Sequence, residues 1–166
     1  MTEHDAVKII KGNIAFTREL IDAGETPEVI GTVSGSESAR EFWQSVLDRA
    51  GETLKAREAV SFHEDLPVNQ AFGILLLWQR LKPYVREDRG SLVAFVFGEG
   101  TRATPFTETD NAQKPAIATY ASTPGADGSQ RQLSMVELAM YYRVPVQQYL
   151  RRSGFDGLVV QWGDEV

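Results

Sequence analysis

The sequence contains no cysteine. This absence excludes a disulfide-bonded scaffold, a thiolate metal site and a cysteine nucleophile, and it fits a cytoplasmic location. Long apolar runs are also missing: the longest, Ala71 to Trp78, falls short of the about 20 residues that a membrane-spanning helix needs. The stretch from Met1 to Lys11 mixes acidic and basic residues, which argues against a signal peptide. We therefore expect no membrane partner.

Basic charge is scarce as well. The chain has 17 Lys and Arg against 23 Asp and Glu, for a net charge of -6. A nucleic-acid groove normally needs a basic face, so nucleic acid is not an expected partner, whereas a small phosphorylated ligand needs only a local basic pocket. The 166 residues, 42% apolar and 24% charged, are typical of one folded globular domain.

The first half of the sequence has helical periodicity. Apolar residues at positions 7, 10, 14 and 21 predict a first helix, and Thr26-Pro27-Glu28 has the cap, proline and acid that are typical of another helix start. Further helices are predicted over residues 37–50 and 67–81. The last is apolar around most of its circumference, so we expect it to be buried on several sides. Residues 52–66 favour a short helix and a loop.

The second half predicts a sheet. Residues 92–97 form a continuous apolar run, which indicates a central parallel strand, and residues 157–162 indicate a second. Residues 101–133 are expected to be mostly loop. Ser134 to Glu137 has the pattern of a capping box and predicts a helix to about Arg143, which Pro145 breaks or kinks before a second piece continues to Arg152. Strand, loop, helix and strand make a right-handed crossover unit.

The predicted fold class is therefore α/β, with a helical N-terminal extension over residues 1–90 and the start of a Rossmann-like parallel sheet over residues 91–166. Two strands alone would leave bare edges. We expect the chain to be the N-terminal part of a longer enzyme. Completion of the sheet by a second copy, as a homo-oligomer through the sheet or the helical region, and an underestimated number of strands are the alternatives.

A glycine-rich segment follows the first predicted strand: Gly98, Glu99, Gly100, Thr101 and Arg102. It would lie at the carboxyl edge of the sheet, where open α/β sheets bind ligands. Glycines let the backbone approach a ligand closely, and consecutive amides can point at phosphate oxygens. Arg102 would add a planar two-pronged contact and Lys114 a mobile charge. A Gly-x-Gly pair alone is also a common tight turn, which is the structural alternative.

The wider string resembles the signature of the sugar-nucleotidyltransferases, Gly-x-Gly-Thr-Arg-x-x-Pro-x-Thr followed by Lys-Pro. The matching residues are Gly98, Gly100, Thr101, Arg102, Pro105, Thr107 and Lys114-Pro115. The resemblance covers about residues 91–163 and favours the uridylyltransferase branch. The sequence departs from the signature at Phe97, where a small residue is usual, and at Gln113, where the family has proline. The longer spacing to Lys114 is a further departure.

This resemblance implies the fold of the nucleotide-diphospho-sugar transferases and a reaction. A nucleoside triphosphate, UTP in the uridylyltransferase branch, and a sugar 1-phosphate would give a nucleoside-diphosphate sugar and pyrophosphate. By the resemblance, Gly98, Glu99, Gly100 and Thr101 bind the nucleotide, and Arg102 stabilises the leaving pyrophosphate. Lys114 contacts the reacting phosphate, and Mg²⁺ bridges the phosphates.

Two acidic sequences are weaker metal candidates. Gly163-Asp164 resembles the Gly-Asp pair that holds magnesium in nucleotidyltransferases, but it comes earlier in the chain than that aspartate, which favours a polar turn. His63-Glu64-Asp65 are adjacent residues, which rarely converge on one ion. The alternative to an enzyme is a non-catalytic interaction or assembly domain with a vestigial glycine loop. We expect little or no turnover from these 166 residues alone.

Overall fold

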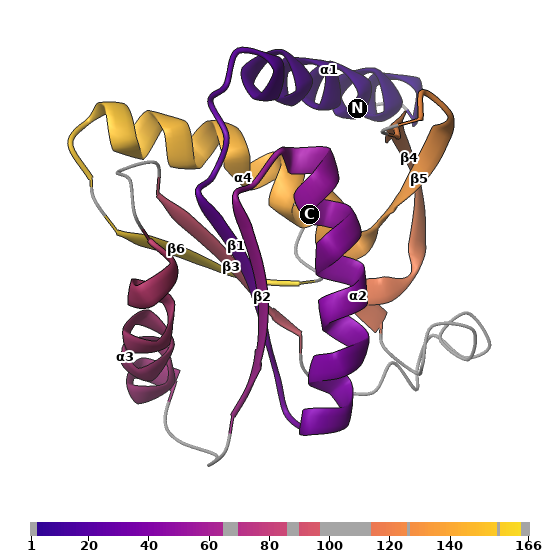
Figure 1. Cartoon of the computed structure of the whole chain (residues 1–166). Coiled ribbons are helices and arrows are strands. Elements are labelled where there is room, and N and C mark those ends of the chain that lie inside the picture. The colour runs from indigo at the N-terminus through magenta and orange to yellow at the C-terminus, as the bar shows by residue number, and fades with distance from the viewer. Residues whose placement is uncertain are drawn as a thin grey trace.

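A computed structural model describes residues 3–64, 70–85, 90–96, 114–125, 127–155 and 157–163 (Figure 1). Helices and strands alternate through most of the chain. The elements are α1 (Glu3–Asp22), β1 (Val29–Ser34), α2 (Glu37–Leu54), β2 (Glu58–His63), α3 (Gln70–Leu81), η1 (Lys82–Tyr84), β3 (Ser91–Val96), η4 (Lys114–Ala116), β4 (Ala118–Pro124), β5 (Gln130–Ser134), α4 (Met135–Arg152) and β6 (Leu158–Trp162). The protein is thus mixed α/β. In the described residues no helix has both the length and the apolar character needed to cross a membrane.

Four parallel strands form the main sheet, in the order β2-β1-β3-β6. All six residues of β1 are buried, as expected for an inner strand covered on both faces. A separate antiparallel hairpin, β4–β5, precedes α4. The predicted strands over 92–97 and 157–162 are confirmed as β3 and β6.

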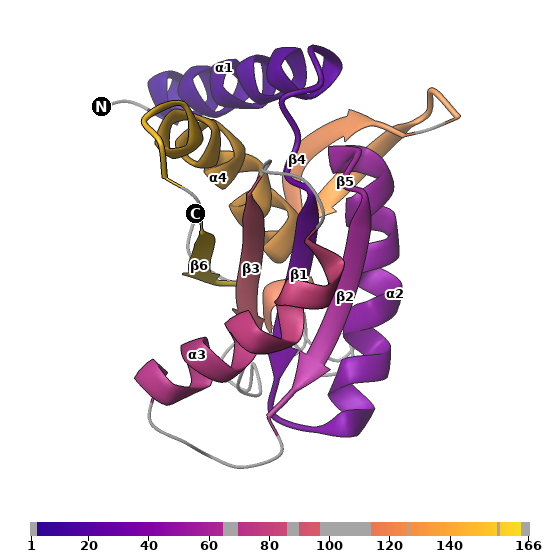
Figure 2. The same cartoon turned by 60° about the vertical axis from the view of Figure 1, so that its left-hand side comes forward.

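The helices cover the two faces of the sheet unequally. Helices α2 and α4 share the larger core, in which Trp43, Leu47 and Met140 pack with Leu92 of β3. The other face carries α3, whose Leu77 and Leu81 meet Val29, Val33 and Val93 (Figure 2). Successive strand residues alternate between these two cores, because side chains of a strand point to opposite faces.

The β3-to-β6 connection differs in hand from the other two crossovers. The step from β3 to β6 runs along the sheet in the direction opposite to the step from β1 to β2, yet the connecting helices α4 and α2 lie on the same face. The step from β2 to β3 also runs opposite to the step from β1 to β2, but its helix α3 lies on the other face. The β2–α3–β3 and β1–α2–β2 crossovers therefore have the same hand. Because about 98% of such crossovers are right-handed, we assign these two as right-handed and β3–α4–β6 as left-handed. This corrects the predicted right-handed unit. The connection contains the β4–β5 hairpin besides α4, so it is not the compact unit to which the steric rule applies.

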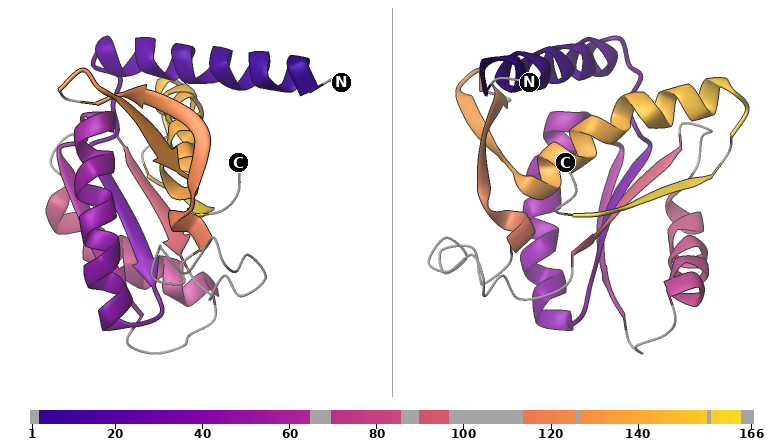
Figure 3. Two further views of the ribbon diagram at one scale, coloured as in Figure 1. Left: turned by 90° about the vertical axis from the view of Figure 1, so that its right-hand side faces the viewer. Right: turned by 180° about the vertical axis from the view of Figure 1, so that it is seen from behind.

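Helix α4 runs as one helix through Pro145. The predicted capping box is confirmed: Ser134 accepts from the Glu137 amide, and the Glu137 carboxylate accepts from the Ser134 amide at 2.8 Å. The sequence predicts a break or a kink at Pro145. The break is wrong, and α1 supplies the reason. Proline lacks the N–H that would bond to the carbonyl of Tyr141, and Thr17 Oγ1 of α1 donates to that carbonyl at 3.2 Å instead. Figure 3 shows α1 lying along α4.

The outer edge of β2 is partly covered by a side chain. Gln44 of α2 accepts from the amide of Ser61 at 2.8 Å and donates to the carbonyl of Ala59 at 2.8 Å. It thereby replaces part of a missing neighbouring strand, which protects an edge from pairing with another chain.

Three predictions about local structure are wrong. Residues 29–34 and 58–63 form β1 and β2, where a helix and a loop were predicted. Thr26-Pro27-Glu28 therefore leads into a strand and does not start a helix. The first half of the chain thus contributes two strands to the sheet. Residues 118–134 form a hairpin rather than a loop. Helix α3 is present but is not buried on several sides: it packs one stripe on the sheet, and Phe72 stays 66% exposed and Leu75 59%.

Candidate functional site

The carboxyl ends of the parallel strands meet at one edge of the sheet. Ser34, the last residue of β1, pairs with His63 of β2 on one side and with Val96 of β3 on the other. The glycine-rich segment begins two residues after Val96 in the sequence, at Gly98. Ser34 is therefore the centre of the edge at which the sequence predicts a nucleotide site.

The connections after β1 and β2 part to opposite faces of the sheet. The chain leaves β1 toward α2 on one face and leaves β2 toward α3 on the other. Both strand ends lie at the carboxyl edge, where open α/β sheets bind ligands, next to the β1/β3 position at which the strand order reverses. Ser34 and His63 end these two strands, side by side at that edge.

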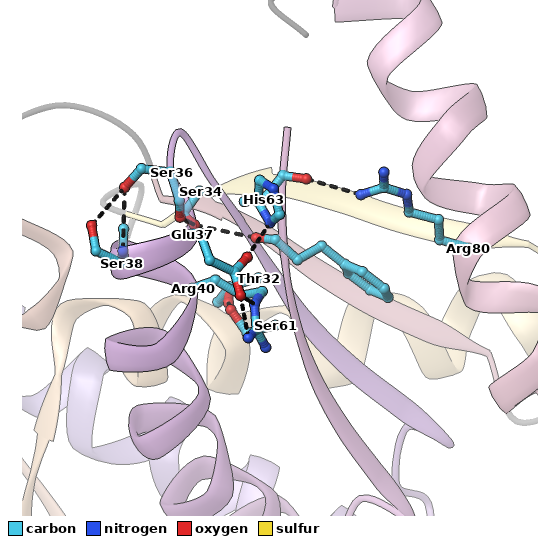
Figure 4. Close-up of polar contacts among 11 residues, drawn as sticks. Thr32, Ser34, Ser36, Glu37, Ser38, Arg40, Ser61, His63 and Arg80 are labelled. Atoms are coloured by element: carbon cyan, nitrogen blue, oxygen red, sulfur yellow. Dashed lines mark hydrogen bonds and ion pairs between the residues drawn. The ribbon is translucent and has the colours of Figure 1, made fainter. Parts of the chain in front are cut away.

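Serine residues shape the turn from β1 into α2 (Figure 4). The buried Ser34 hydroxyl lies 3.2 Å from the carbonyl oxygens of Ser36 and Phe62, so it ties the turn to β2. Ser36 is the N-cap of α2 in extended conformation and accepts from the Ala39 amide at 3.2 Å. This cap fixes where α2 begins, and its amino-terminal end points its free amides and dipole toward the same edge.

A histidine–carboxylate pair crosses the β1/β2 position. His63 Nδ1 lies 2.6 Å from Glu37 Oε2, and the side chains are 29% and 53% exposed. Arg40 Nε donates to the other oxygen of Glu37 at 2.7 Å, and Arg80 donates to the His63 carbonyl at 2.9 Å (Figure 4). A carboxylate on Nδ1 favours the tautomer with a lone pair on Nε2, the form in which imidazole accepts a proton or a hydrogen bond. The cluster can therefore move a proton or hold a polar ligand group.

The same cluster is poorly suited to Mg²⁺. Both oxygens of Glu37 already face cationic or N–H groups, Arg40 and His63. Throughout the described ranges, no three His, Cys, Asp or Glu side chains gather as a metal site would require. Magnesium prefers carboxylate oxygens that are not neutralised by a cation, so these residues do not fit the ion that the resemblance implies.

Most residues predicted for the nucleotide site lie outside the described residues. They are Gly98, Glu99, Gly100, Thr101 and Arg102, together with Asp164. Lys114 is described: it is exposed and opens the short helix η4, whose Pro115 and Ala116 are buried. Next to η4, Ile117 accepts from the amide of Met135, the first residue of α4. Lys114 therefore stands beside the start of α4.

The residues Ser34, Ser36, Glu37 and Arg40 were not identified from the sequence, and His63 was considered for metal binding alone. A usable signal was present, because Ser34-Gly35-Ser36 followed by an acid before a helical stretch is typical of a strand–cap–helix junction. Comparisons with protein-family models, curated protein sequences and solved structures found no match to this chain.

Proposed function

We propose that this chain carries the nucleotide-binding part of a nucleotidyltransferase that joins a nucleoside triphosphate, UTP by preference, to a sugar 1-phosphate. The observation that carries the proposal is positional. The string from Gly98 to Arg102 begins two residues after the end of β3, a buried inner strand of the parallel sheet whose neighbour β1 leads into α2. The amino-terminal end of α2, with Arg40 in its first turns, lies at that edge as well and would supply amides and one cation to a phosphate held there.

The reaction needs charge neutralisation more than covalent chemistry. A phosphate oxygen of the sugar 1-phosphate attacks the α-phosphorus of the triphosphate. The bond between that phosphorus and the oxygen bridging to the β-phosphate breaks, and pyrophosphate leaves with the electron pair. On this proposal the amides of Gly98 to Thr101 hold phosphate oxygens, and Arg102 neutralises the pyrophosphate. Arg40, near the start of α2, adds a further donor at the same edge.

A second function is favoured by one observation. Apolar side chains of α3 lie exposed at helical spacing, at Phe72, Leu75 and Leu76. Trp162 on the β6 edge of the sheet is 41% exposed as well. Exposed apolar residues gathered on one helix are typical of a protein interface, so an interaction or assembly role is the alternative.

Titration of the chain with UTP in a calorimeter separates the two proposals. Nucleotide binding should weaken at least tenfold in Arg102→Ala, because a charge-assisted contact to phosphate is lost. Arg49→Ala is the matched control, since Arg49 is exposed on α2 well away from the edge. Equal affinity in native protein and Arg102→Ala would remove the nucleotidyltransferase proposal. The assembly proposal would then be tested by sedimentation of Leu75→Gln, which should dissociate any oligomer.

A further inference from the structure

A groove lies between α1 and β4, near the end of the sheet where the strands begin. Figure 3 shows α1 and the β4–β5 hairpin side by side there. The groove has a volume of about 260 Å³, and its lining comes from one face of α1 and from the second half of β4 with Tyr120. It is thus separate from the carboxyl edge where nucleotide binding is proposed.

Two cationic side chains stand on the α1 side. Lys11 and Arg18 both line the groove. They are seven positions apart, which places them on one helix face about 10 Å apart along the axis, within joint reach of their long side chains. The chain carries a net charge of -6. Two cations therefore gather here against the overall charge, although Arg18 also forms an ion pair with Asp22 at 3.3 Å. Burial opposes the charge of Arg18, but contacts with Tyr141 and Asp22 outweigh it and raise the pKa of Arg18.

The rest of the lining is mostly apolar, with the hydroxyl residues Ser122 and Thr123 and one aromatic residue, Tyr120. Ile14, Ala15, Ala121 and Pro124 supply aliphatic surface. Along β4, Ala121 and Thr123 point into the protein, whereas Tyr120 points outward and stays 68% exposed. Tyr120 lines the same groove as Lys11 and Arg18, so its exposed ring is available to a ligand held there. An aromatic face next to cations suits a ligand that has both a ring and an acid group.

The size of the groove limits the ligand. An engineered cavity of about 150 Å³ holds benzene, and sites for drug-sized ligands begin near about 300 Å³. At about 260 Å³ the groove accommodates one ring with one substituent. A full nucleotide would not be covered by it.

We propose that the groove between α1 and β4 binds a small aromatic anion: a single ring carrying one phosphate or carboxylate, with the acid group between Lys11 and Arg18 and the ring beside Tyr120. The site does not depend on nucleotide binding at the carboxyl edge. If the groove did not bind an aromatic anion, the nucleotide-binding proposal would be unaffected. If the carboxyl edge did not bind a nucleotide, the groove proposal would be unaffected.

Amide NMR spectra of the full chain, titrated with four probes, test the proposal. Phenyl phosphate and benzoate carry ring and acid, phenol carries the ring alone, and inorganic phosphate the acid alone. At least one of the two probes that carry both ring and acid, phenyl phosphate or benzoate, should shift the amides of Ala121, Ser122 and Thr123 saturably. Phenol and inorganic phosphate should bind at least tenfold more weakly. Whichever acid binds more tightly identifies the preferred acid group. Saturation elsewhere without shifts at these amides would overturn the proposal, as would equal binding of inorganic phosphate.

Three variants complete the test. Lys11→Gln and Tyr120→Ala change exposed side chains, so both should stay folded. Each should weaken binding of the better probe at least fivefold. Lys8→Gln is the matched control, because Lys8 is exposed on the same helix but does not line the groove. If Lys8→Gln and Lys11→Gln weakened probe binding equally, the loss would come from the overall charge of the protein, and this result would contradict the proposed site.

Discussion

The hydroxyl of Thr17 on α1 donates to the main-chain carbonyl of Tyr141 on α4, at 3.2 Å in a buried setting. That carbonyl is the one left without a helical partner by Pro145. The contact therefore lets α4 continue through a proline and fastens α1 to the rest of the protein. It links two elements 124 positions apart in the sequence.

Thr17→Val should lower the free energy of unfolding by about 1–3 kcal/mol, because the shape is kept but a buried carbonyl loses its donor. In a Pro145→Ala background, the restored amide of residue 145 can bond to Tyr141, so Thr17→Val should cost less. Urea unfolding of the four proteins gives the coupling. The same cost in both backgrounds would show that the carbonyl does not need Thr17.

Gly90 should tolerate a side chain poorly. Its φ is +80°, and a Cβ there would lie 2.8 Å from Nε2 of the buried Gln147. Gly90→Ala should therefore cost both backbone strain of about 1–3 kcal/mol and a clash. Gly128→Ala is the matched control, since its φ is +79° with nothing within 4 Å of the added atom. The urea midpoint should fall further for Gly90→Ala than for Gly128→Ala. Equal decreases in the two variants would show that a clash with Gln147 contributes nothing.

Asp22 should make stability depend on acid pH. A hydrogen bond from Lys55 at 2.9 Å, aided by Arg18, lowers the pKa of Asp22 below its ordinary value. A carboxyl with a lowered pKa stabilises the fold fully above its unfolded pKa of about 3.9, and this stabilisation is lost as the pH falls through the lower folded value. Asp22→Asn should thus lower the urea midpoint at pH 6 but not near pH 2. In a Lys55→Gln background, Asp22→Asn should lower the urea midpoint at pH 6 by less. An undiminished effect of Asp22→Asn in that background would show that Lys55 does not lower the pKa of Asp22.

Arg40 should matter for nucleotide binding and little for stability. Its contact with Glu37 is on the surface, so Arg40→Ala should change the free energy of unfolding by at most about 1 kcal/mol. If the carboxyl edge receives phosphate, the same variant should weaken UTP binding several-fold. Arg49→Ala serves as the control, since Arg49 is nine positions further along α2. Indistinguishable UTP affinities for the two variants would place the ligand elsewhere.

The parts predicted well from sequence depend on local patterns. The apolar runs of β3 and β6, the helix predicted over residues 37–50 within α2, and the Ser134–Glu137 cap all follow from neighbours in the chain. These features need no knowledge of distant contacts. They were sufficient to predict an α/β protein.

The parts that were missed depend on distant contacts. In β1, Gly31 weakens the strand pattern, yet a Cβ there would lie 3.1 Å from the carbonyl oxygen of Val60 on β2, so close strand packing explains it. The continuity of α4 depends on Thr17. The pairing of His63 with Glu37 depends on the register of β1 with β2. Each of these partners is separated by many residues, and the sequence alone does not bring them together.

Mapping UTP contacts by amide NMR tests the central claim most directly. If a triphosphate is held at the carboxyl edge, UTP should shift the amides of Ser34, Ser36 and His63 saturably. In Arg102→Ala the same shifts should need at least tenfold more UTP while the spectrum stays folded. UTP-induced shifts confined to other parts of the protein, or none at saturating UTP, would contradict nucleotide binding at this edge.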